Sequence, residues 1–248
     1  MNKKILVAGA LICASTLVFA QSQSVQKRSG SSNNNKETYV ENEYLNDIDT
    51  EIIMGLAEAD ELDTKLVALQ YIADAINAGN TSPGVIQALD KLSGEGTLTE
   101  SRTKNRKVNN FPEVRRQACL LMANVPGEHT KNQLIDVLVT DDEPMVLSAA
   151  VQSLAAINPE DADQVISAIA FVHKRIYYLN PTSSFAWEVV DAFEKLGPNA
   201  SNRSEMVNTL TMISVNYRYS KPVRDKALNL LKKFSSSSGS SSKKTDEK

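Results

Sequence analysis

Histidine and cysteine, the residues that most often bind metals or act as nucleophiles, are nearly missing from this sequence, with two of each among 248 residues. His129 and His173 have no cysteine, histidine or paired carboxylate at a ligand spacing, so we expect no metal site. Cys119 is the only cysteine after the first twenty residues, which excludes an intramolecular disulfide in a processed chain. Its apolar helical surroundings favour a small buried packing residue over a nucleophile.

Motifs of known catalytic sites are also missing. The sequence contains no glycine-rich phosphate loop, no nucleophile elbow and no zinc-protease motif. The acidic run Asp141-Asp142-Glu143 lacks the further oxygens that calcium needs, and we interpret it as a solvated turn that caps the following helix. We therefore expect no enzyme activity and no cofactor.

The chain has no excess of positive charge. It holds 27 basic and 30 acidic residues, and loss of Lys3 and Lys4 with a signal peptide would leave 25 and 30. General nucleic-acid binding needs a basic field, so this balance excludes it.

The first twenty residues have the layout of a secretory signal peptide. Lys3 and Lys4 precede a short apolar run over residues 5–12, and residues 18–20 form a small-residue cleavage pattern before Gln21. The apolar run is too short for a comfortable membrane span. We expect a periplasmic or secreted protein of bacterial origin.

Two alternatives for this segment stay open: an uncleaved anchor, and a lipoprotein signal that ends at Cys13. Simple cleavage is favoured because Ile12 stands where lipoprotein processing requires a small side chain. Membrane contact is expected only if the signal region anchors the chain.

Composition divides the rest of the chain into three parts. Residues 21–43 are rich in Ser, Asn, Gln and Lys and predict a flexible leader. Residues 44–234 are predicted to be the folded body, and residues 235–248 a disordered serine-rich tail.

Within the body, apolar residues recur at helical spacing, and one apolar template returns four times. Its steps are four, four and three residues, which mark one face of a helix, and a less regular copy begins at Thr64. The four copies are Val114, Ala118, Met122, Val125; Val146, Ala150, Leu154, Ile157; Phe185, Val189, Phe193, Leu196; and Val223, Ala227, Leu231, Phe234.

A second helix is expected between successive copies, with buried positions such as Leu134 and Leu138. One helix pair recurs every 32 to 39 residues. This predicts an all-α fold, an α-α superhelix of about four to five helix pairs in which each unit buries its apolar face on its neighbours.

The residues at the start of the template helices resemble the HEAT repeat. The stretches are residues 111–118 (Phe-Pro-Glu-Val-Arg-Arg-Gln-Ala), 141–150 and 221–227 (Lys-Pro-Val-Arg-Asp-Lys-Ala), and the likeness covers about residues 60–234. Phe185-Ala186 departs from the Val-Arg pattern. The resemblance implies a HEAT-like solenoid that acts as a scaffold or adaptor, binding a protein partner on a face formed by the second helices. We interpret Arg115 and Arg224 as structural, each paired with an acidic side chain in the next turn.

Three surfaces are candidates for binding. The segment 93–110 interrupts the helical pattern and carries Arg102, Lys104, Arg106 and Lys107. It either docks an acidic partner or an anionic envelope polymer, or is a flexible solvated insertion. The second surface is aromatic and either forms an interface or seals the repeat junctions; its members are Tyr177, Tyr178, Trp187, Tyr217 and Tyr219.

The third candidate surface consists of the two ends of the body. The acid-rich residues 41–63 contrast with a basic stretch over 218–233, and this opposition predicts weak head-to-tail self-association.

The function predicted from these observations is an exported protein-binding scaffold of the bacterial cell envelope. An enzyme or lyase subunit on the same architecture is one alternative, and it would need a carboxylate and an aromatic residue converging on the binding face. A lipid-anchored structural protein of the envelope is the other.

Overall fold

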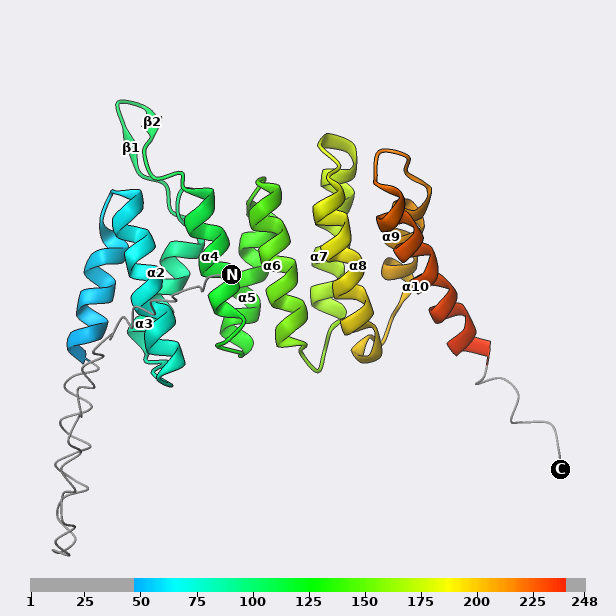
Figure 1. The fold of residues 1–248 in the computed structure, drawn as a ribbon, viewed down its shortest axis with the longest axis horizontal. Helices are drawn as coiled ribbons and strands as arrows, with labels where there is room; N and C mark the ends of the chain where they lie inside the picture. The colour runs from blue at the N-terminus through cyan, green and yellow to red at the C-terminus, as the bar shows by residue number, and fades with distance from the viewer. Residues whose placement is uncertain (1–46, 240–248) are drawn as a thin grey trace, which may run out of the picture. The chain divides into compact units, whose positions relative to one another are not determined.

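The computed structural model of the protein describes residues 47–239 (Figure 1). The predicted signal peptide, the predicted leader and residues 240–248 lie outside the described residues. Most of the described chain is helical. The helices are residues 47–58, α2 (Leu62–Asn77), α3 (Pro83–Ser93), α4 (Pro112–Met122), α5 (Glu128–Thr140), α6 (Pro144–Ile157), α7 (Asp163–Leu179), α8 (Ser183–Leu196), α9 (Ser204–Val215) and α10 (Lys221–Gly239), with the 3₁₀ turn η1 (Gly197–Asn199) after α8.

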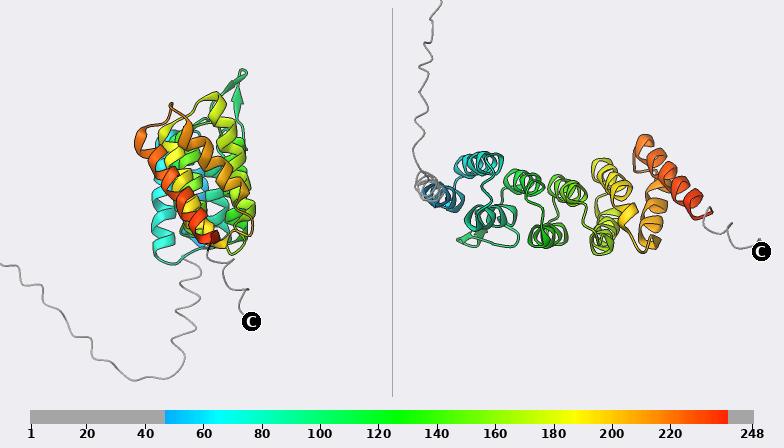
Figure 2. Two further views of the ribbon diagram at one scale, coloured as in Figure 1. Left: turned by 90° about the vertical axis from the view of Figure 1, so that its right-hand side faces the viewer. Right: turned by 90° about the horizontal axis from the view of Figure 1, so that it is seen from below.

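These helices stand in two rows (Figure 2). One row contains α2, α4, α6, α8 and α10, and the other contains α3, α5, α7 and α9. Helix 47–58 stands at the end of the stack, where Glu58 pairs with Lys91 of α3. Within a row, α4 packs on α6 and α6 on α8, while α3, α5 and α9 pack on the helices that follow them. The chain is therefore an all-α helical repeat solenoid, as the sequence predicted, with hairpins that pile up in sequence order. No helix within residues 47–239 is both long and apolar enough to cross a membrane.

Local sequence explains where several helices begin and end. Pro83, Pro112 and Pro144 each occupy the first helical position of α3, α4 and α6. Proline suits this position because its missing N–H would have no partner inside the helix. Asn158 ends α6 in the left-handed conformation, with φ of 46°. The helix α10 continues to Gly239 and thus extends into the segment 235–248, where the composition predicts a disordered tail.

The repeated apolar template forms the continuous core. Its first helix buries Val114, Ala118 and Met122, and the same positions are buried in α6 and, with bulkier residues, in α8. Ala118 and Ala150 have no exposed surface, and these small side chains let neighbouring helices of the first row approach closely. Ser153 on α6 donates a hydrogen bond of 2.7 Å to the carbonyl of Cys119 on α4, which fixes the two helices relative to each other.

Residues 94–111 are the exception to the helical pattern. They contain an antiparallel hairpin of two short strands, β1 (Arg102–Thr103) and β2 (Arg106–Lys107), which projects beyond the ends of α3 and α4 (Figure 1). Lys104 and Asn105 turn the chain with φ of 49° and 65°. Positive φ at both central residues is the conformation of a type I′ turn, whose twist matches that of the flanking strands.

Candidate functional site

Four connections lie along one edge of the stack, and all the candidate residues except Trp187 lie on them or in the last turn of α7. The connections are 94–111, 141–143, 180–182 and 216–220, all at the top of Figure 1. We call them, with the last turn of α7, the joint edge. Every second connection of an up-and-down helical stack returns to the same side, so the repeat itself brings these segments together.

A buried ion pair begins a network beneath the joint edge. The ammonium group of Lys65 on α2 lies 3.1 Å from a carboxylate oxygen of Glu95, and both side chains are almost fully buried. The same ammonium donates a 2.9 Å hydrogen bond to the carbonyl of Ala57. Lys65 therefore ties the first hairpin to the loop that precedes the β hairpin.

The second buried pair joins α4 to the next connection. Arg115 donates from Nε to Oδ2 of Asp141 at 2.5 Å and from a terminal nitrogen to Oδ1 at 3.3 Å, and each side chain is 1% exposed. Its other terminal nitrogen donates to the carbonyl of Glu95 and to the Asn110 side chain, each at 3.0 Å. Arg115 is structural, as the sequence predicted. Its partner lies in the α5–α6 loop, however, rather than one turn away, and Asp141 is buried rather than solvated.

Arg175 on α7 extends this network across the stack. It donates to the carbonyl oxygens of Val139 at 2.5 Å and of Asp141 at 2.6 Å. Lys65, Glu95, Arg115, Asp141 and Arg175 thus connect α2, α4 and α7 through the loops of the joint edge. Buried charged groups hold a geometry only when their partners are in place, so this network positions the loops above it.

The basic hairpin stands on an ordered base. Asn109 is buried; its side chain accepts from the Ser101 N–H and donates to the Thr99 carbonyl, both at 2.8 Å. Gly96 has φ of 73°, and a Cβ there would lie 2.3 Å from the Asn109 carbonyl oxygen. The segment is therefore folded, whereas a solvated insertion was one of the two interpretations that the sequence left open.

Charge on the hairpin is divided between paired and free cations. Glu100 accepts ion pairs from Arg102 and Lys107, both at 2.7 Å. Lys104 and Arg106, at the turn, are exposed and take part in no salt bridge among residues 47–239. The hairpin thus presents two uncompensated positive charges at its tip.

Three of the five predicted aromatic residues gather around a histidine. The ring of Tyr177 lies 5.1 Å from that of Tyr178 and 6.4 Å from that of Tyr219. Tyr219 is buried, and its hydroxyl lies 3.2 Å from Nε2 of the fully buried His173. Burial raises the pKa of Tyr219 to about 12 and lowers the pKa of His173 to about 4. Tyr219 and His173 therefore pack the junction of α7 with the last hairpin.

Trp187 and Tyr217 lie apart from this cluster and contact cations of α10. The Lys226 ammonium is 4.0 Å from the centre of the Trp187 ring, and the Arg224 guanidinium is 5.4 Å from that of Tyr217. Arg224 thus contacts an aromatic ring in place of the acidic partner that the sequence predicted. Tyr217 is 90% exposed, so its contact with Arg224 covers only a small part of the ring.

The joint edge also exposes apolar residues that the sequence reading missed. Leu179 in the last turn of α7 is 72% exposed, beside the predicted Tyr178, which is 67% exposed. Val215 at the end of α9 is 61% exposed, two residues before Tyr217. Phe171, which is also exposed, lies two turns before Tyr178 on α7 and lines a groove of about 340 Å³ between α7 and α9. The spacing of seven between Phe171 and Tyr178 was the available signal, since it places both on one side of α7.

The groups that most often catalyse reactions are enclosed or engaged in structural contacts. Burial, reinforced by the charge of Asp141, raises the pKa of the Cys119 thiol to about 12, so it is protonated at neutral pH. His129 is exposed and paired with Asp90 at 2.6 Å. Within residues 47–239 no cluster of three or more His, Cys, Asp or Glu side chains has the arrangement of a metal site.

Comparison with known proteins gives one match. The family model described as HEAT repeats matches residues 105–170, which run from the β hairpin through α4, α5 and α6 into α7. No curated protein matches the chain. No solved structure matches it either. Together, the family match and the helical stack support a HEAT-repeat protein.

Proposed function

We propose that the protein is a binding scaffold that captures a protein partner on its joint edge. HEAT repeats generally serve as protein-interaction scaffolds, and the match to residues 105–170 supports this class of role. The observation that carries the proposal is the exposure of Tyr178 and Leu179 in the last turn of α7 and of Tyr217 in the connection 216–220. Arg175 ties α7 to the buried ion network. Exposed aromatic side chains on a fixed backbone bury much area at little entropic cost when they bind.

The chemistry of the edge indicates an acidic partner with an apolar segment. Lys104 and Arg106 project on the β hairpin at one end of the edge, and the exposed apolar side chains lie at the other. A partner that spans both would place carboxylates near the hairpin and aliphatic or aromatic side chains near Tyr217. The charged end raises the association rate, while the apolar end contributes most of the residence time.

We further propose that the protein is not an enzyme. Its buried charged side chains Lys65, Glu95, Arg115 and Asp141 are engaged with one another and with backbone carbonyls. Such groups hold loops in place and are not presented to a substrate. The groove between α7 and α9 is open, and its carboxylate, Glu205, accepts a hydrogen bond from the Ser167 hydroxyl.

Site-specific photo-cross-linking in the native cell tests the binding surface. A photoreactive residue is placed at Tyr178, Tyr217 or Lys104, and at the exposed Asn124 and Glu160 on the opposite edge as controls. We expect the joint-edge positions to cross-link one common protein that the controls do not. Identical products from both edges, or none from the joint edge, would refute the assignment.

Charge reversal then separates the hairpin from general electrostatics. Lys104→Glu is compared with Lys195→Glu, which changes the net charge equally on the exposed end of α8. The first variant should lower the cross-linking yield at Tyr217, and the second should leave it unchanged.

We also propose export across the bacterial inner membrane to the periplasm or beyond. The support is the order of charge, apolar run and small residues in positions 1–20, which lie outside the described residues. The mass of the mature protein tests it. A chain that begins at Gln21 supports soluble export, a lipid on Cys13 supports anchoring, and an intact Met1 in the cytoplasm contradicts both.

A further inference from the structure

Among residues 47–239, the two terminal hairpins of the stack each have one face without a neighbouring helix. In a solenoid every inner hairpin covers its apolar sides with the hairpins before and after it. Within that range, the first hairpin, helix 47–58 with α2, contacts α3 and α4 on one side, and the last, α9 with α10, contacts α7 and α8 on one side.

The outer face of the first hairpin carries exposed apolar residues at helical spacing. In helix 47–58, Ile53 and Ala57 face inward and are buried, whereas Ile48 and Ile52 lie about opposite and are 38% and 47% exposed. A Cβ on Gly55 would meet nothing within 4 Å, which places this side in open space. On α2, the same outward side bears Val67 and Tyr71, 46% and 49% exposed.

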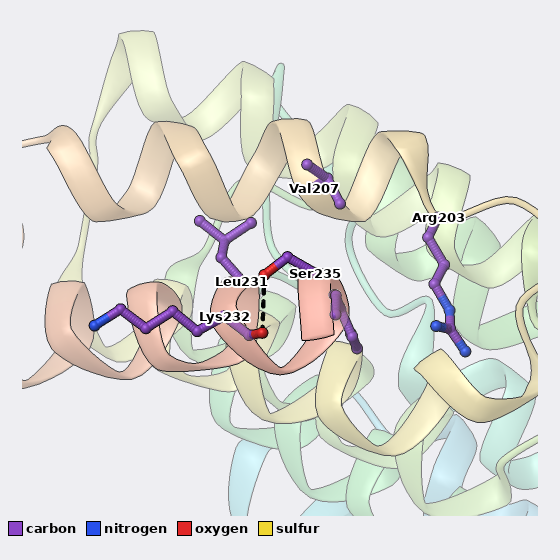
Figure 3. Close-up of a pocket in the computed structure, with 6 residues that line it drawn as sticks. Arg203, Val207, Leu231, Lys232 and Ser235 are labelled. Atoms are coloured by element: carbon purple, nitrogen blue, oxygen red, sulfur yellow. Dashed lines mark hydrogen bonds between the residues drawn. The ribbon is translucent and has the colours of Figure 1, made fainter. Parts of the chain in front are cut away.

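The outer face of the last hairpin contains a groove between α9 and α10, shown in Figure 3. It has a volume of about 380 Å³, and Val207 from α9 and Leu231 from α10 line it together with Phe234. Arg203 and Lys232 stand at its borders. Leu228, 44% exposed, lies one turn before Lys232 on the same side of α10.

The two faces carry opposite charge. Residues 47–77 hold eight carboxylates and one basic side chain, Lys65, which is already paired inside the protein. Residues 203–235 hold seven basic side chains and two carboxylates. Each face has apolar side chains at its centre, and the charges around the two centres are opposite in sign. The first face therefore complements the last face, whereas two first faces or two last faces repel each other.

We propose that the first hairpin of one copy docks on the last hairpin of a second copy. Ile48 and Ile52 enter the α9–α10 groove, and the acidic residues beside them meet Arg203 and Lys232. The second copy thereby continues both helical rows. Because the two faces differ, the contact is heterologous and repeats without closing, so it produces open chains of increasing length.

The composition of the adjacent tail excludes it as the occupant of this groove. Residues 235–248 consist of Ser, Gly, Lys, Thr, Asp and Glu and include no apolar side chain. Occupation by residues 1–46 of the same chain would be an intramolecular contact, and the average mass would then be independent of protein concentration.

Sedimentation equilibrium of the mature full chain at low salt tests the proposal. The weight-average mass should rise steadily with concentration, and raising the salt from 50 to 500 mM should lower the association constant at least tenfold, because salt screens exposed charges (roughly a 3-fold shorter Debye length). Ile52→Lys should lower it at least tenfold as well. Val139→Lys, an equally drastic change of an exposed apolar residue in the middle of the stack, should leave it unchanged.

Mixing two end variants gives the sharpest result. Ile52→Lys has a damaged first hairpin and an intact last one, and Lys232→Glu has the reverse. Each alone should remain monomeric, and the mixture should form a one-to-one dimer that grows no further. Monomers at every concentration of the unchanged protein, association of Ile52→Lys equal to that of Val139→Lys, or no dimer in the mixture would each overturn the proposal. Circular dichroism of every variant checks that the helices are retained.

Discussion

Removal of the Asp141 carboxylate is the most direct test of how the joint edge is held. In Asp141→Ala, the Arg115 guanidinium loses both hydrogen bonds to the carboxylate, at 2.5 and 3.3 Å, but stays in a site where it is 1% exposed. The Glu143 N–H loses its 2.9 Å bond to the same side chain. Breaking a buried pair on one side leaves an uncompensated charge and costs about 3–5 kcal/mol.

This cost translates into a large thermal shift. For a folded part of this size, about 1 kcal/mol corresponds to roughly 2–4 °C in Tm. We therefore expect Asp141→Ala to melt roughly 6–20 °C below the unchanged protein. The control is Asp225→Ala, which breaks the exposed pair with Lys221 at 3.3 Å and should cost about 0.5 kcal/mol or less.

A double variant identifies the buried charge as the cause. Arg115→Met combined with Asp141→Ala removes both members of the pair, so it should be more stable than Asp141→Ala alone despite the extra substitution. Amide hydrogen exchange should show the loss of protection in α4 to α7, where the network runs. This account of the edge would be refuted if Asp141→Ala were as stable as the Asp225→Ala control. It would also be refuted if the stability lost in the double variant equalled the sum of the losses in Asp141→Ala and Arg115→Met.

Three further perturbations follow from individual contacts. Lys226→Met removes the ammonium that lies 4.0 Å from the centre of the Trp187 ring and forms an ion pair with Asp191, so Trp187 fluorescence should change while stability falls by about 1–2 kcal/mol. Burial lowers the pKa of His173 from 6.5 to about 4, so between these pH values the unfolded chain binds more protons than the folded one. The free energy of unfolding should therefore be greatest above pH 6.5 and fall by about 3 kcal/mol as the pH drops to 4. Urea unfolding of His173→Gln should lack this pH dependence. Gly96→Ala should cost about 1–3 kcal/mol because its φ is positive and its site is filled, whereas Gly55→Ala, in an open helical site, should raise Tm and gain about 0.5–1 kcal/mol.

The rows of helices were predictable because their signal is local and repeated. Val114, Ala118 and Met122 follow the helical period, and the later copies of this spacing leave each helix only one apolar face to bury. The stacking order then follows from short connections, since consecutive helices have little choice but to pack as neighbours.

The network beneath the joint edge was only partly predictable. The Arg115 motif indicated a structural arginine, but Asp141 lies 26 residues further along the chain. An acidic run followed by a proline has the same local pattern whether its first carboxylate is solvated or buried. Only the packing of α4 against α6 brings the two side chains together.

The β hairpin was not predicted from the sequence, for a different reason. Its strands have two residues each, too few to produce an alternating pattern. The turn relies on Lys104 and Asn105, and lysine is not a residue that indicates positive φ. The Asn109 side chain, which closes the base, acts across eight to ten residues and leaves no periodic trace.

Binding at the joint edge and association through the ends use separate surfaces, so the two proposals make a common prediction. In an open chain of copies, each copy contributes one joint edge. Such a chain therefore binds a surface that displays many identical partner segments at several points at once. Such multivalency strengthens apparent affinity by about 10²–10⁴ without any new contact. Above the concentration at which chains form, the unchanged protein should therefore dissociate from an immobilised array of the cross-linked partner far more slowly than Ile52→Lys. On an array too sparse for two points of contact, the two proteins should dissociate at the same rate. Equal rates on the dense array would show that the ends and the edge do not cooperate.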